Sequence, residues 1–403
     1  MIKGERRKER GERRKRVENI RAAPGYAVYG PEYIDRETYQ QMENAMKMPV
    51  VVRGALMADA HVGYGLPIGG VVAAYNAVMP YGVGMDIGCR MCLSIYDLSP
   101  ALLESGKDRL KNILTECTRF GLAEFSDIRE HELMERDEFK EISFIRSLKD
   151  MFFHQLGTSG HGNHFVDVGY VTIEEPTPEL GLGAGSRFAI LSHSGSRNFG
   201  AEVARHYTDI AKKKLGLTGE AGNLAWLELD SEEGQEYWRA MVLAGDYSAA
   251  NHRLIHERLS KALGEKPFTT IENHHNFAWI ESLSPTEKLV IHRKGATPAH
   301  DGDTGVIPGN MISPAFIVAG KGNPQSLYSA SHGAGRQVSR NKARASFDRE
   351  GFSRTLRRAG VELIGGGAEE VPEAYKDIEQ IMEAQRELVK TLGKFYPRIV
   401  RME

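Results

Sequence analysis

The sequence predicts an α+β fold: one large, compact domain in which mixed β-sheets are flanked by helices. Helical stripes and short apolar runs follow one another without the regular alternation of a doubly wound parallel sheet. Hydrophobic residues make up 41% of the 403 residues and charged residues 26%, which is typical of a globular protein. The chain shows neither a repeat nor a low-complexity linker, so residues 23–403 are expected to form one unit.

A basic segment precedes this unit. Residues 1–21 carry ten basic and four acidic side chains and have no apolar face that could pack in a core. We predict a tail over residues 1–22, either solvated or acting as an arm that adds non-specific affinity for nucleic acid. The segment lacks the apolar stretch of a secretory signal, and three cysteines are too few for a disulfide scaffold. We therefore expect a soluble, cytoplasmic protein.

Strands are predicted first from an uncharged stretch, residues 60–85. Its length is compatible with a membrane span, but six glycines and two prolines exclude a lipid-exposed helix and favour buried strand and turn. Short apolar runs elsewhere are also typical of strands. The predicted strands cover residues 50–52, 71–74, 165–168, 188–191, 289–291 and 316–319.

Four helices are predicted from apolar periodicity and from residues typical of helix ends. A Ser-Pro pair marks the first start, and glycines mark the first two ends. The fourth prediction rests on apolar side chains at helical spacing after Pro372. The predicted helices cover residues 99–121, 203–216, 237–263 and about 372–392.

Histidines carry the main functional signal. Eight of the fourteen lie in short, weakly charged segments rich in glycine, asparagine or hydroxyl residues, where backbone N–H groups can turn toward an anion. They are His61, His161, His164, His193, His274, His275, His292 and His332. A single histidine is usually a core or surface residue, but eight in one kind of segment indicate a functional site.

The segment GMDIGCRM offers metal ligands. Asp86 and Cys89 are close enough for a carboxylate and a thiolate to face one cation, and a thiolate can bridge two. Spacing alone does not say which histidines complete the shell. Cys89 and Cys92 also form a C-x-x-C, but neither a second pair nor a thioredoxin-like context supports a zinc knuckle or a redox motif. A structural buried cysteine explains Cys92 about equally well.

The segment SHGAGRQVSR is typical of phosphate chemistry. Small neighbours leave the His332 imidazole unobstructed, Gly333 and Gly335 let the backbone approach a phosphate, and Arg336 and Arg340 can neutralise its charge. His332 can thus act as a general base, a metal ligand or a nucleophile toward phosphorus. Walker and Rossmann fingerprints are absent from the sequence. The residues indicate a metal-dependent phosphoryl- or nucleotidyl-transfer site.

The sequence resembles the RtcB family of RNA-splicing ligases from about residue 48 to its end. The shared segments, in order, are DAHVGYGLPIGG, DIGC, GNHFVDV, HSGSR, HHN, RKGA, IPGNM and SHGAGR. This resemblance implies an RtcB-like fold and an RNA ligase that uses GTP and two Mn²⁺ ions. Its substrates would be RNA 2′,3′-cyclic phosphate or 3′-phosphate ends and 5′-hydroxyl ends, in tRNA splicing or RNA repair.

The resemblance also assigns metal ligands. Asp86, Cys89 and His275 would hold one manganese ion. Cys89, His164 and His193 would hold the other, so that the Cys89 thiolate bridges the two. Such a donor set suits a borderline ion such as manganese, although zinc or cobalt would also bind tightly.

By the same resemblance, His332 would be the nucleophile. It would take the guanylyl group from GTP and pass it to the RNA 3′-phosphate before the 5′-hydroxyl displaces GMP. The implied nucleotide contacts are Asn163, His164, Phe165, Val166, Asp167, His275, Asn276, Pro308, Gly309, Asn310, Met311, His332, Gly333, Ala334, Gly335 and Tyr375.

Three positions depart from the family pattern. Met402 stands where the family has a lysine that reaches the guanine base, Ala315 replaces a serine contact, and the shorter Asp167 replaces a glutamate. The resemblance therefore implies a divergent paralogue, suited to RNA repair, with intact metal binding and a weakened preference for GTP over ATP.

Two alternatives are a metal-dependent phosphodiesterase that processes RNA ends without sealing them, and a non-catalytic RNA-binding paralogue. The sequence does not say whether an activating protein partner is needed.

Overall fold

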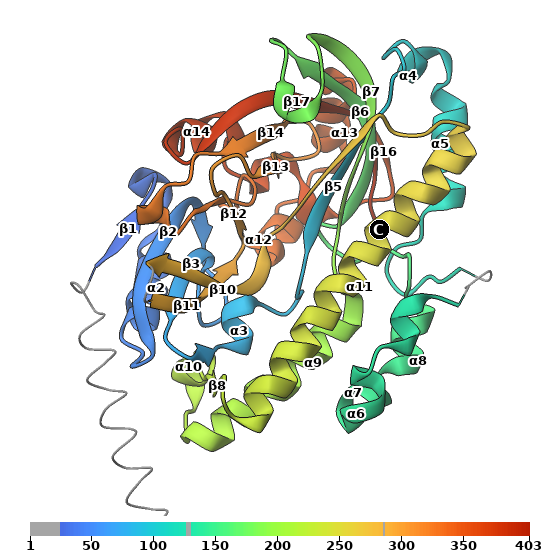
Figure 1. Ribbon diagram of the computed structural model, residues 1–403. Helices are drawn as coiled ribbons and strands as arrows, with labels where there is room; N and C mark the ends of the chain where they lie inside the picture. Colours follow the sequence, from blue (N-terminus) through green and yellow to red (C-terminus); the bar gives the residue numbers. More distant parts are fainter. Residues whose placement is uncertain (1–24, 126–129, 285–286) are drawn as a thin grey trace, which may run out of the picture.

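Two β-sheets of different size form the centre of the molecule (Figure 1). The computed structural model describes residues 25–125, 130–284 and 287–403, and the predicted tail over residues 1–22 lies outside them. In spatial order the larger sheet contains β13 (Thr304–Pro308), β14 (Ala315–Gly320), β17 (Val389–Arg401), β6 (Phe165–Ile173), β7 (Gly185–Ser194), β5 (Arg90–Ile95) and β9 (Thr269–His274), with β16 (Glu362–Ile364) beside β17. The smaller sheet contains β1 (Tyr26–Val28), β2 (Val51–His61), β3 (Ile68–Ala74), β11 (Glu287–Lys294) and β10 (Asn276–Ser284).

Both sheets are mixed, which confirms the predicted α+β class. Most neighbouring strands are antiparallel, whereas β1 runs parallel to β2 and β16 parallel to β17. Two short ladders lie beside the sheets. They pair β12 (Ala296–Pro298) with β15 (Ser329–Ser331), and β4 (Ala77–Val78) with β8 (Leu227–Glu228).

Helices flank the sheets. The α-helices are α2 (Arg36–Met46), α3 (Pro80–Val83), α4 (Leu102–Ser105), α5 (Lys107–Cys117), α6 (Glu138–Glu141), α7 (Ser143–Ser147), α8 (Lys149–His154), α9 (Arg197–Leu215), α10 (Gly219–Gly222), α11 (Glu232–Leu263), α12 (Arg340–Ala345), α13 (Arg349–Ala359) and α14 (Ile378–Ala384). Short 3₁₀ turns cover η1 (Pro31–Tyr33), η2 (Glu132–Glu135), η3 (Pro178–Leu180), η4 (Pro324–Ser326), η5 (Ala368–Glu370) and η6 (Pro372–Ala374). No helix in the described part of the chain combines the length and apolarity needed to cross a membrane.

The long helix α11 lies across one face of the larger sheet, with α9 beside it (Figure 1). Its start is fixed by Ser231, whose hydroxyl accepts a hydrogen bond from the Gly234 amide, and its end by Gly264 in the left-handed conformation. Apolar side chains such as Ile255 and Leu259 pack against Val166 of β6 and its neighbours. This packing fixes one face of the strands that carry the site.

The other face of the larger sheet encloses a second core, because the sheet curls until β13 approaches β9. Met91, Leu191 and Ile317 belong to this core. Asn273 links the two approaching strands: its amide nitrogen donates to the Val306 carbonyl at 3.2 Å, and its oxygen accepts from the Val306 amide at 2.8 Å. A side chain thus replaces the ladder hydrogen bonds that would otherwise close the sheet.

All six predicted strands correspond to strands of the two sheets, and five lie entirely within them. The strand predicted over 50–52 begins one residue later, at the start of β2. The stretch over residues 60–85 is, as predicted, mostly strand and turn. The helices predicted over 203–216 and 237–263 correspond to α9 and α11, which begin earlier than predicted, at Arg197 and Glu232. In both, a glycine in the left-handed conformation ends the helix.

Two helix predictions need correction. The helix predicted over 99–121 is interrupted at Gly106 and ends at Cys117, because glycine favours a break between α4 and α5. The helix predicted over 372–392 is wrong in extent: α-helix is confined to α14, the 3₁₀ turn η6 precedes it, and Leu392 lies in β17. The apolar residues after α14 pair with β6 and β14, a long-range interaction that outweighs local periodicity.

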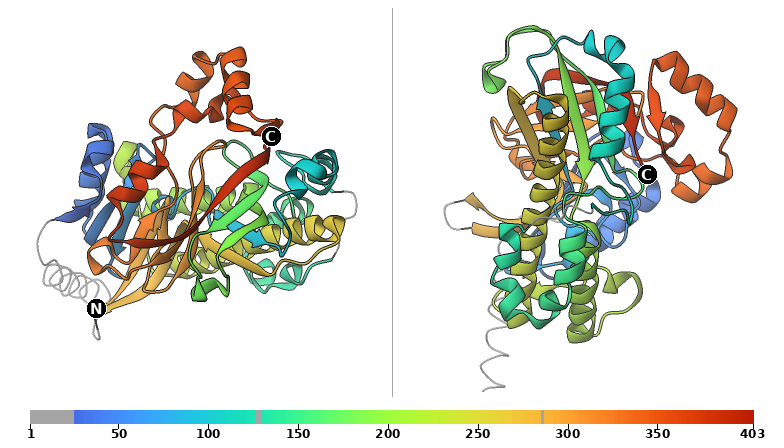
Figure 2. Two further views of the ribbon diagram at one scale, coloured as in Figure 1. Left: turned by 90° about the horizontal axis from the view of Figure 1, so that it is seen from above. Right: turned by 90° about the vertical axis from the view of Figure 1, so that its right-hand side faces the viewer.

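Helices α12 and α13 project from the body of the molecule on the side where the chain ends (Figure 2). They follow directly after the segment that carries His332 and Arg336. This projection places a helical pair next to the candidate site.

Candidate active site

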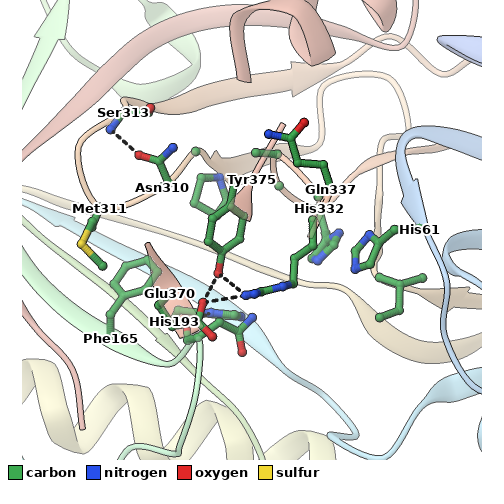
Figure 3. Close-up of a pocket in the computed structure, with 18 of the residues that line it drawn as sticks. His61, Phe165, His193, Asn310, Met311, Ser313, His332, Gln337, Glu370 and Tyr375 are labelled. Atoms are coloured by element: carbon green, nitrogen blue, oxygen red, sulfur yellow. Dashed lines mark hydrogen bonds and ion pairs between the residues drawn. The ribbon is translucent and has the colours of Figure 1, made fainter. Parts of the chain in front are cut away.

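A cavity of about 650 Å³ lies between the two sheets (Figure 3). The smaller sheet contributes His61 and Ile68, and the larger sheet contributes Phe165 and His193. The remaining walls come from the loop after β13, the segment 332–340 and the turn that carries Tyr375. The cavity therefore joins segments that are far apart in the sequence.

His332 lies in this cavity and is held by a buried carboxylate. Its Nδ1 is 2.6 Å from Oδ2 of Asp59, and its backbone amide donates to the same oxygen at 3.2 Å. Because a carboxylate can only accept, the proton lies on Nδ1 and the lone pair on Nε2 is left free. Asp59 has no exposed surface. Burial acts to raise the pKa of the Asp59 carboxyl, but His332 and Lys376 outweigh it and hold the pKa below its usual value.

The predicted metal ligands lie in one cluster. The Sγ of Cys89 is 3.5 Å from Nε2 of His164 and 3.2 Å from Nε2 of His193. Oδ2 of Asp86 lies 2.9 Å from Nε2 of His164, and Nε2 of His275 lies 3.3 Å from Nε2 of His193. The trio of Cys89, His164 and His193 is compact, with one donor atom from each within 4.8 Å of the others.

The cluster fits a divalent transition cation. Nδ1 of His193 donates to the Asn163 carbonyl at 2.8 Å, which directs its Nε2 lone pair at the Cys89 sulfur. The Nδ1 atoms of His164 and His275 are buried without a hydrogen-bond partner among the described residues. Thiolate, imidazole and carboxylate form a donor set that borderline ions prefer. The structure thus supports metal binding by these residues.

Without a cation, the Cys89 thiol keeps its proton and the His193 imidazole is neutral, whereas Asp86 is a carboxylate whose pKa His164 lowers to about 2. Burial and the Asp86 carboxylate raise the pKa of the Cys89 thiol well above its usual value. Burial and the nearby His164 lower the pKa of His193 to about 3. The thiol binds a cation by losing its proton, so occupancy of the cluster is expected to fall at low pH.

Glycines let the ligands approach one another. A Cβ at Gly160 would lie 1.8 Å from Nδ1 of His164, and a Cβ at Gly195 would lie 2.1 Å from a carboxylate oxygen of Asp86. Both positions therefore require glycine for close approach. In this region, the missing side chains of the glycines leave the space that the metal ligands occupy.

Most of the predicted nucleotide contacts line the cavity. They are Asn163, Phe165, Asp167, Pro308, Gly309, Asn310, Met311, His332, Gly333, Ala334, Gly335 and Tyr375. Tyr375 donates its hydroxyl to Glu370, which also pairs with Arg336 at 3.1 Å (Figure 3). Burial and Glu370 raise the pKa of Tyr375, so its hydroxyl stays protonated.

The remaining predicted contacts lie beside the cavity. His164 and His275 belong to the metal-ligand cluster. Val166 points to the opposite face of β6, into the core under α11. Asn276 braces the turn that carries Asp86: its Nδ2 donates to the Asp86 carbonyl at 3.1 Å. These two side chains do not line the cavity.

Three of the eight histidines do not join the site. His161 is exposed and pairs with Glu403 at 2.6 Å. His274 packs against Trp279, with ring centroids 5.0 Å apart. His292 is buried and accepts a hydrogen bond from the Met79 amide at 2.9 Å. The other five surround the cavity and the metal-ligand cluster.

The three positions that depart from the family pattern all face the cavity. Met402, Ala315 and Asp167 are among its lining residues. Met402 is nearly buried and packs with Val361 and Met311. Burial raises the pKa of the Asp167 carboxyl well above its usual value, which favours its protonated form.

Sequence reasoning missed three charged residues of the site. They are Asp59, Glu370 and Lys294, whose ammonium is buried and donates to the Tyr64 carbonyl. Burial lowers the pKa of Lys294 to about 7. Asp59 carried a signal, because it is a charged residue between apolar neighbours in β2.

Comparisons with known proteins agree on one family. The chain matches the family model described as tRNA-splicing ligase RtcB over residues 41–147 and 121–403. It is 30% identical over 389 residues to an Escherichia coli protein named RNA-splicing ligase RtcB1, an alignment that covers 89% of this chain and 92% of that relative. It is also 30% identical over 436 residues to the Nanoarchaeum equitans tRNA-splicing ligase RtcB, covering 89% of this chain and 90% of that relative.

Proposed function

Because the chain belongs to the RtcB family of RNA-splicing ligases, we propose that it is an RNA ligase that uses GTP and manganese. It joins RNA 2′,3′-cyclic phosphate or 3′-phosphate ends to 5′-hydroxyl ends through a guanylylated histidine. One observation carries this proposal: His332, with its Nε2 lone pair free, lies in the cavity with its ring centroid 4.9 Å from that of the candidate metal ligand His275.

Asp59 prepares His332 for attack on phosphorus. The hydrogen bond from Nδ1 to Asp59 fixes the tautomer and the orientation of the ring. When Nε2 bonds to phosphorus the imidazole becomes cationic, and the buried carboxylate stabilises that charge at 2.6 Å. The pair thus favours the charged adduct over the free ring.

The reaction proceeds in three displacements at phosphorus. Nε2 of His332 forms a bond to the α-phosphorus of GTP, and the bond to the α,β-bridging oxygen breaks to release pyrophosphate. An RNA 3′-phosphate oxygen then takes the guanylyl group, which frees the imidazole. The 5′-hydroxyl finally attacks the activated 3′-phosphorus, loses its proton and displaces GMP. A cyclic phosphate is first opened by hydrolysis.

Cations bound by Asp86, Cys89, His164, His193 and His275 would neutralise the charge that develops on the phosphoryl oxygens. Around them, the protein excludes water and holds the reactants. Gly333 and Gly335 bring backbone close to the phosphates, and Arg336 is fixed by Glu370 and Tyr375. Orientation of the reactants by such fixed groups lowers the barrier to each displacement at phosphorus.

A hydrolytic or binding role is the alternative. A phosphodiesterase that processes RNA ends needs the metal ligands, and an RNA-binding paralogue needs neither them nor a phosphorus nucleophile. The Asp59–His332 pair favours the ligase, because it leaves a nucleophilic nitrogen facing the cavity.

The test is incubation of the protein with α-labelled GTP and Mn²⁺. We expect acid-labile label on the protein, no label on His332→Ala, and full labelling of His161→Ala, a histidine in the same kind of segment but exposed outside the cavity. Cys89→Ala is expected to lose both labelling and sealing. Absence of label at saturating GTP, with RNA ends still hydrolysed, would establish the phosphodiesterase instead.

A further inference from the structure

A second set of metal-type donors lies apart from the active site, between the larger sheet and α11. Cys92 of β5 faces His252 and His256 of α11, and one donor atom from each lies within 4.8 Å of the others. All three side chains are buried. The set has the composition of a cysteine-and-two-histidine zinc site.

Secondary structure brings the three donors together. His252 and His256 are four residues apart on α11, so both point from one face of the helix. Side chains alternate along β5, so Cys92 faces α11 while Met91 and Leu93 face the core inside the curled sheet. Rigid elements therefore hold the donors.

The outer nitrogens of both rings are fixed by hydrogen bonds. Nε2 of His252 donates to the Ser194 carbonyl at 3.1 Å, and Nδ1 of His256 lies 2.8 Å from the Ser94 hydroxyl. Their inner nitrogens, Nδ1 of His252 and Nε2 of His256, converge on the Ser192 hydroxyl at 2.7 and 2.8 Å. Histidines that bind metals are anchored through the far nitrogen in this way.

A fourth donor stands next to Cys92. Glu272 is the cross-strand partner of Cys92 on β9, and its Oε1 accepts from the Cys92 thiol at 3.8 Å. Its other oxygen pairs with Arg90 at 3.0 Å. The Cys92 partner on the other side, in β7, is Ser192. A carboxylate and a hydroxyl thus flank the sulfur.

We propose that Cys92, His252 and His256 bind a divalent transition cation of the zinc type, with Glu272 completing the coordination. On binding, the Cys92 thiol loses its proton to solvent, and the inner ring nitrogens exchange their hydrogen bonds with Ser192 for bonds to the cation. The ring proton of His256 then lies on Nδ1, which donates a hydrogen bond to the Ser94 hydroxyl oxygen. The site is separate from the proposed ligase centre and does not rest on it.

Solvent can reach this site through a cavity of about 810 Å³. Cys92, His256, Thr270 and Glu272 line it, and the Glu272 side chain is 36% exposed. A cation can therefore enter without unfolding the protein. Once bound, it would join α11 to β5 and β9, which also carry the residues next to Cys89 and His275.

Cobalt is the probe for this site, because a cobalt–thiolate bond gives an intense charge-transfer absorption in the near ultraviolet. The chelator-treated full-length Cys89→Ser protein, which lacks the active-site thiolate, is titrated with Co²⁺. We expect the thiolate band to appear and to saturate at one equivalent. The Cys89→Ser/Cys92→Ser protein should lose the band, and the matched Cys89→Ser/Cys117→Ser protein should keep it.

Two results would overturn the proposal: absence of the band in the Cys89→Ser protein, or persistence of the band in the Cys89→Ser/Cys92→Ser protein. Cys89→Ser/His256→Gln provides a second test, with a reduced and shifted band expected, and circular dichroism checks the fold of each variant. Cys92→Ser alone should still become labelled by α-labelled GTP. Failure of the cation site and failure of the ligase proposal are therefore distinguishable.

Discussion

At the scale of single residues, the account depends on the contact between Asp59 and His332. We expect Asp59→Asn to lower the rate of guanylylation by about 10² or more, because the amide neither fixes the tautomer as a carboxylate does nor stabilises the charged imidazole. The measurement is the initial rate of label transfer from α-labelled GTP at saturating Mn²⁺. Asp303→Asn, on an exposed turn, is the matched control. Wild-type labelling by Asp59→Asn would contradict the role of this carboxylate.

Met402 is expected to weaken the preference of the protein for GTP over ATP. It lines the cavity at the position where the resemblance to the family places a lysine, and its thioether carries no charge, so we expect a weaker contact with a guanine base. We expect GTP and ATP to compete for labelling with a preference within about tenfold, equivalent to about 1.4 kcal/mol. Met402→Lys should increase the preference for GTP. A strong GTP preference in the unmodified protein would show that other contacts read the base.

Part of the site could be predicted from residue types: Asp86, Cys89 and His332 stand out because their segments are rich in glycine. The assignment of His164, His193 and His275 as metal ligands came from the resemblance to the family. The role of Asp59 could not be derived, because its partner lies 273 residues away and only the pairing of sheets brings them together. The same holds for Glu370, whose importance comes from contacts with Arg336 and Tyr375.

At the scale of elements, sequence signals succeeded where local cues determine the structure. Helix α9 has an apolar stripe and a terminal glycine, and its end was predicted closely, although it begins at Arg197 rather than at residue 203. Strand β17 was not, because its apolar residues also suit a helix and its pairing with β6 and β14 is non-local. Strands β5 and β9 were not predicted: each has six residues, and in β9 a single apolar side chain, Ile271, stands among polar ones.

Helices α12 and α13 are expected to contact RNA. Between residues 340 and 359 the chain has seven basic and two acidic side chains, and the pair projects beside the cavity (Figure 2). Arg357 and Arg358 are exposed and form no ion pair with another described residue. Reversing both charges to glutamate should weaken RNA binding and reduce the slope of log affinity against log salt by about 0.7 per lost phosphate contact.

The control for this surface is the double variant Lys213→Glu/Lys214→Glu at the end of α9, which makes the same change in charge away from α12 and α13. We expect its salt slope to stay close to that of the unmodified protein. Equal slopes for all three proteins would show that the basic helices do not contact RNA.

At the scale of the whole molecule, buried neutral histidines make stability depend on pH. Burial lowers the pKa of His292 to about 4, and its Nε2 accepts from the Met79 amide, so protonation would also break that bond. Between pH 6.5 and 4 the unfolded chain binds a proton that the folded chain excludes, so stability falls as the pH falls. The contribution of His292 is at most on the order of 3 kcal/mol.

Denaturant unfolding at pH 7 and pH 4.5 measures this effect. His292→Gln keeps an acceptor for the Met79 amide but cannot be protonated, so its loss of stability between the two pH values should be smaller than in the unmodified protein. An identical loss in both proteins would show that His292 does not contribute to acid unfolding.

The architecture as a whole explains why the site is built from distant segments. Two mixed sheets meet at the cavity. The smaller sheet carries Asp59 in β2, and the larger sheet carries His193 near the end of β7 and Cys89 directly before β5. The order of these strands could not be read from the sequence. Once the fold is known, several of the shared segments are seen to line one cavity, and others form the metal-ligand cluster beside it.

The most direct test of the central claim is to identify the residue that carries the guanylyl group. The protein is incubated with GTP and Mn²⁺ without RNA, digested under conditions that spare phosphoramidates, and mapped by mass spectrometry. The account predicts one GMP adduct on the peptide that contains His332, removed when RNA with a 3′-phosphate end is added. A GMP adduct on any other residue, or none at saturating GTP, would contradict it.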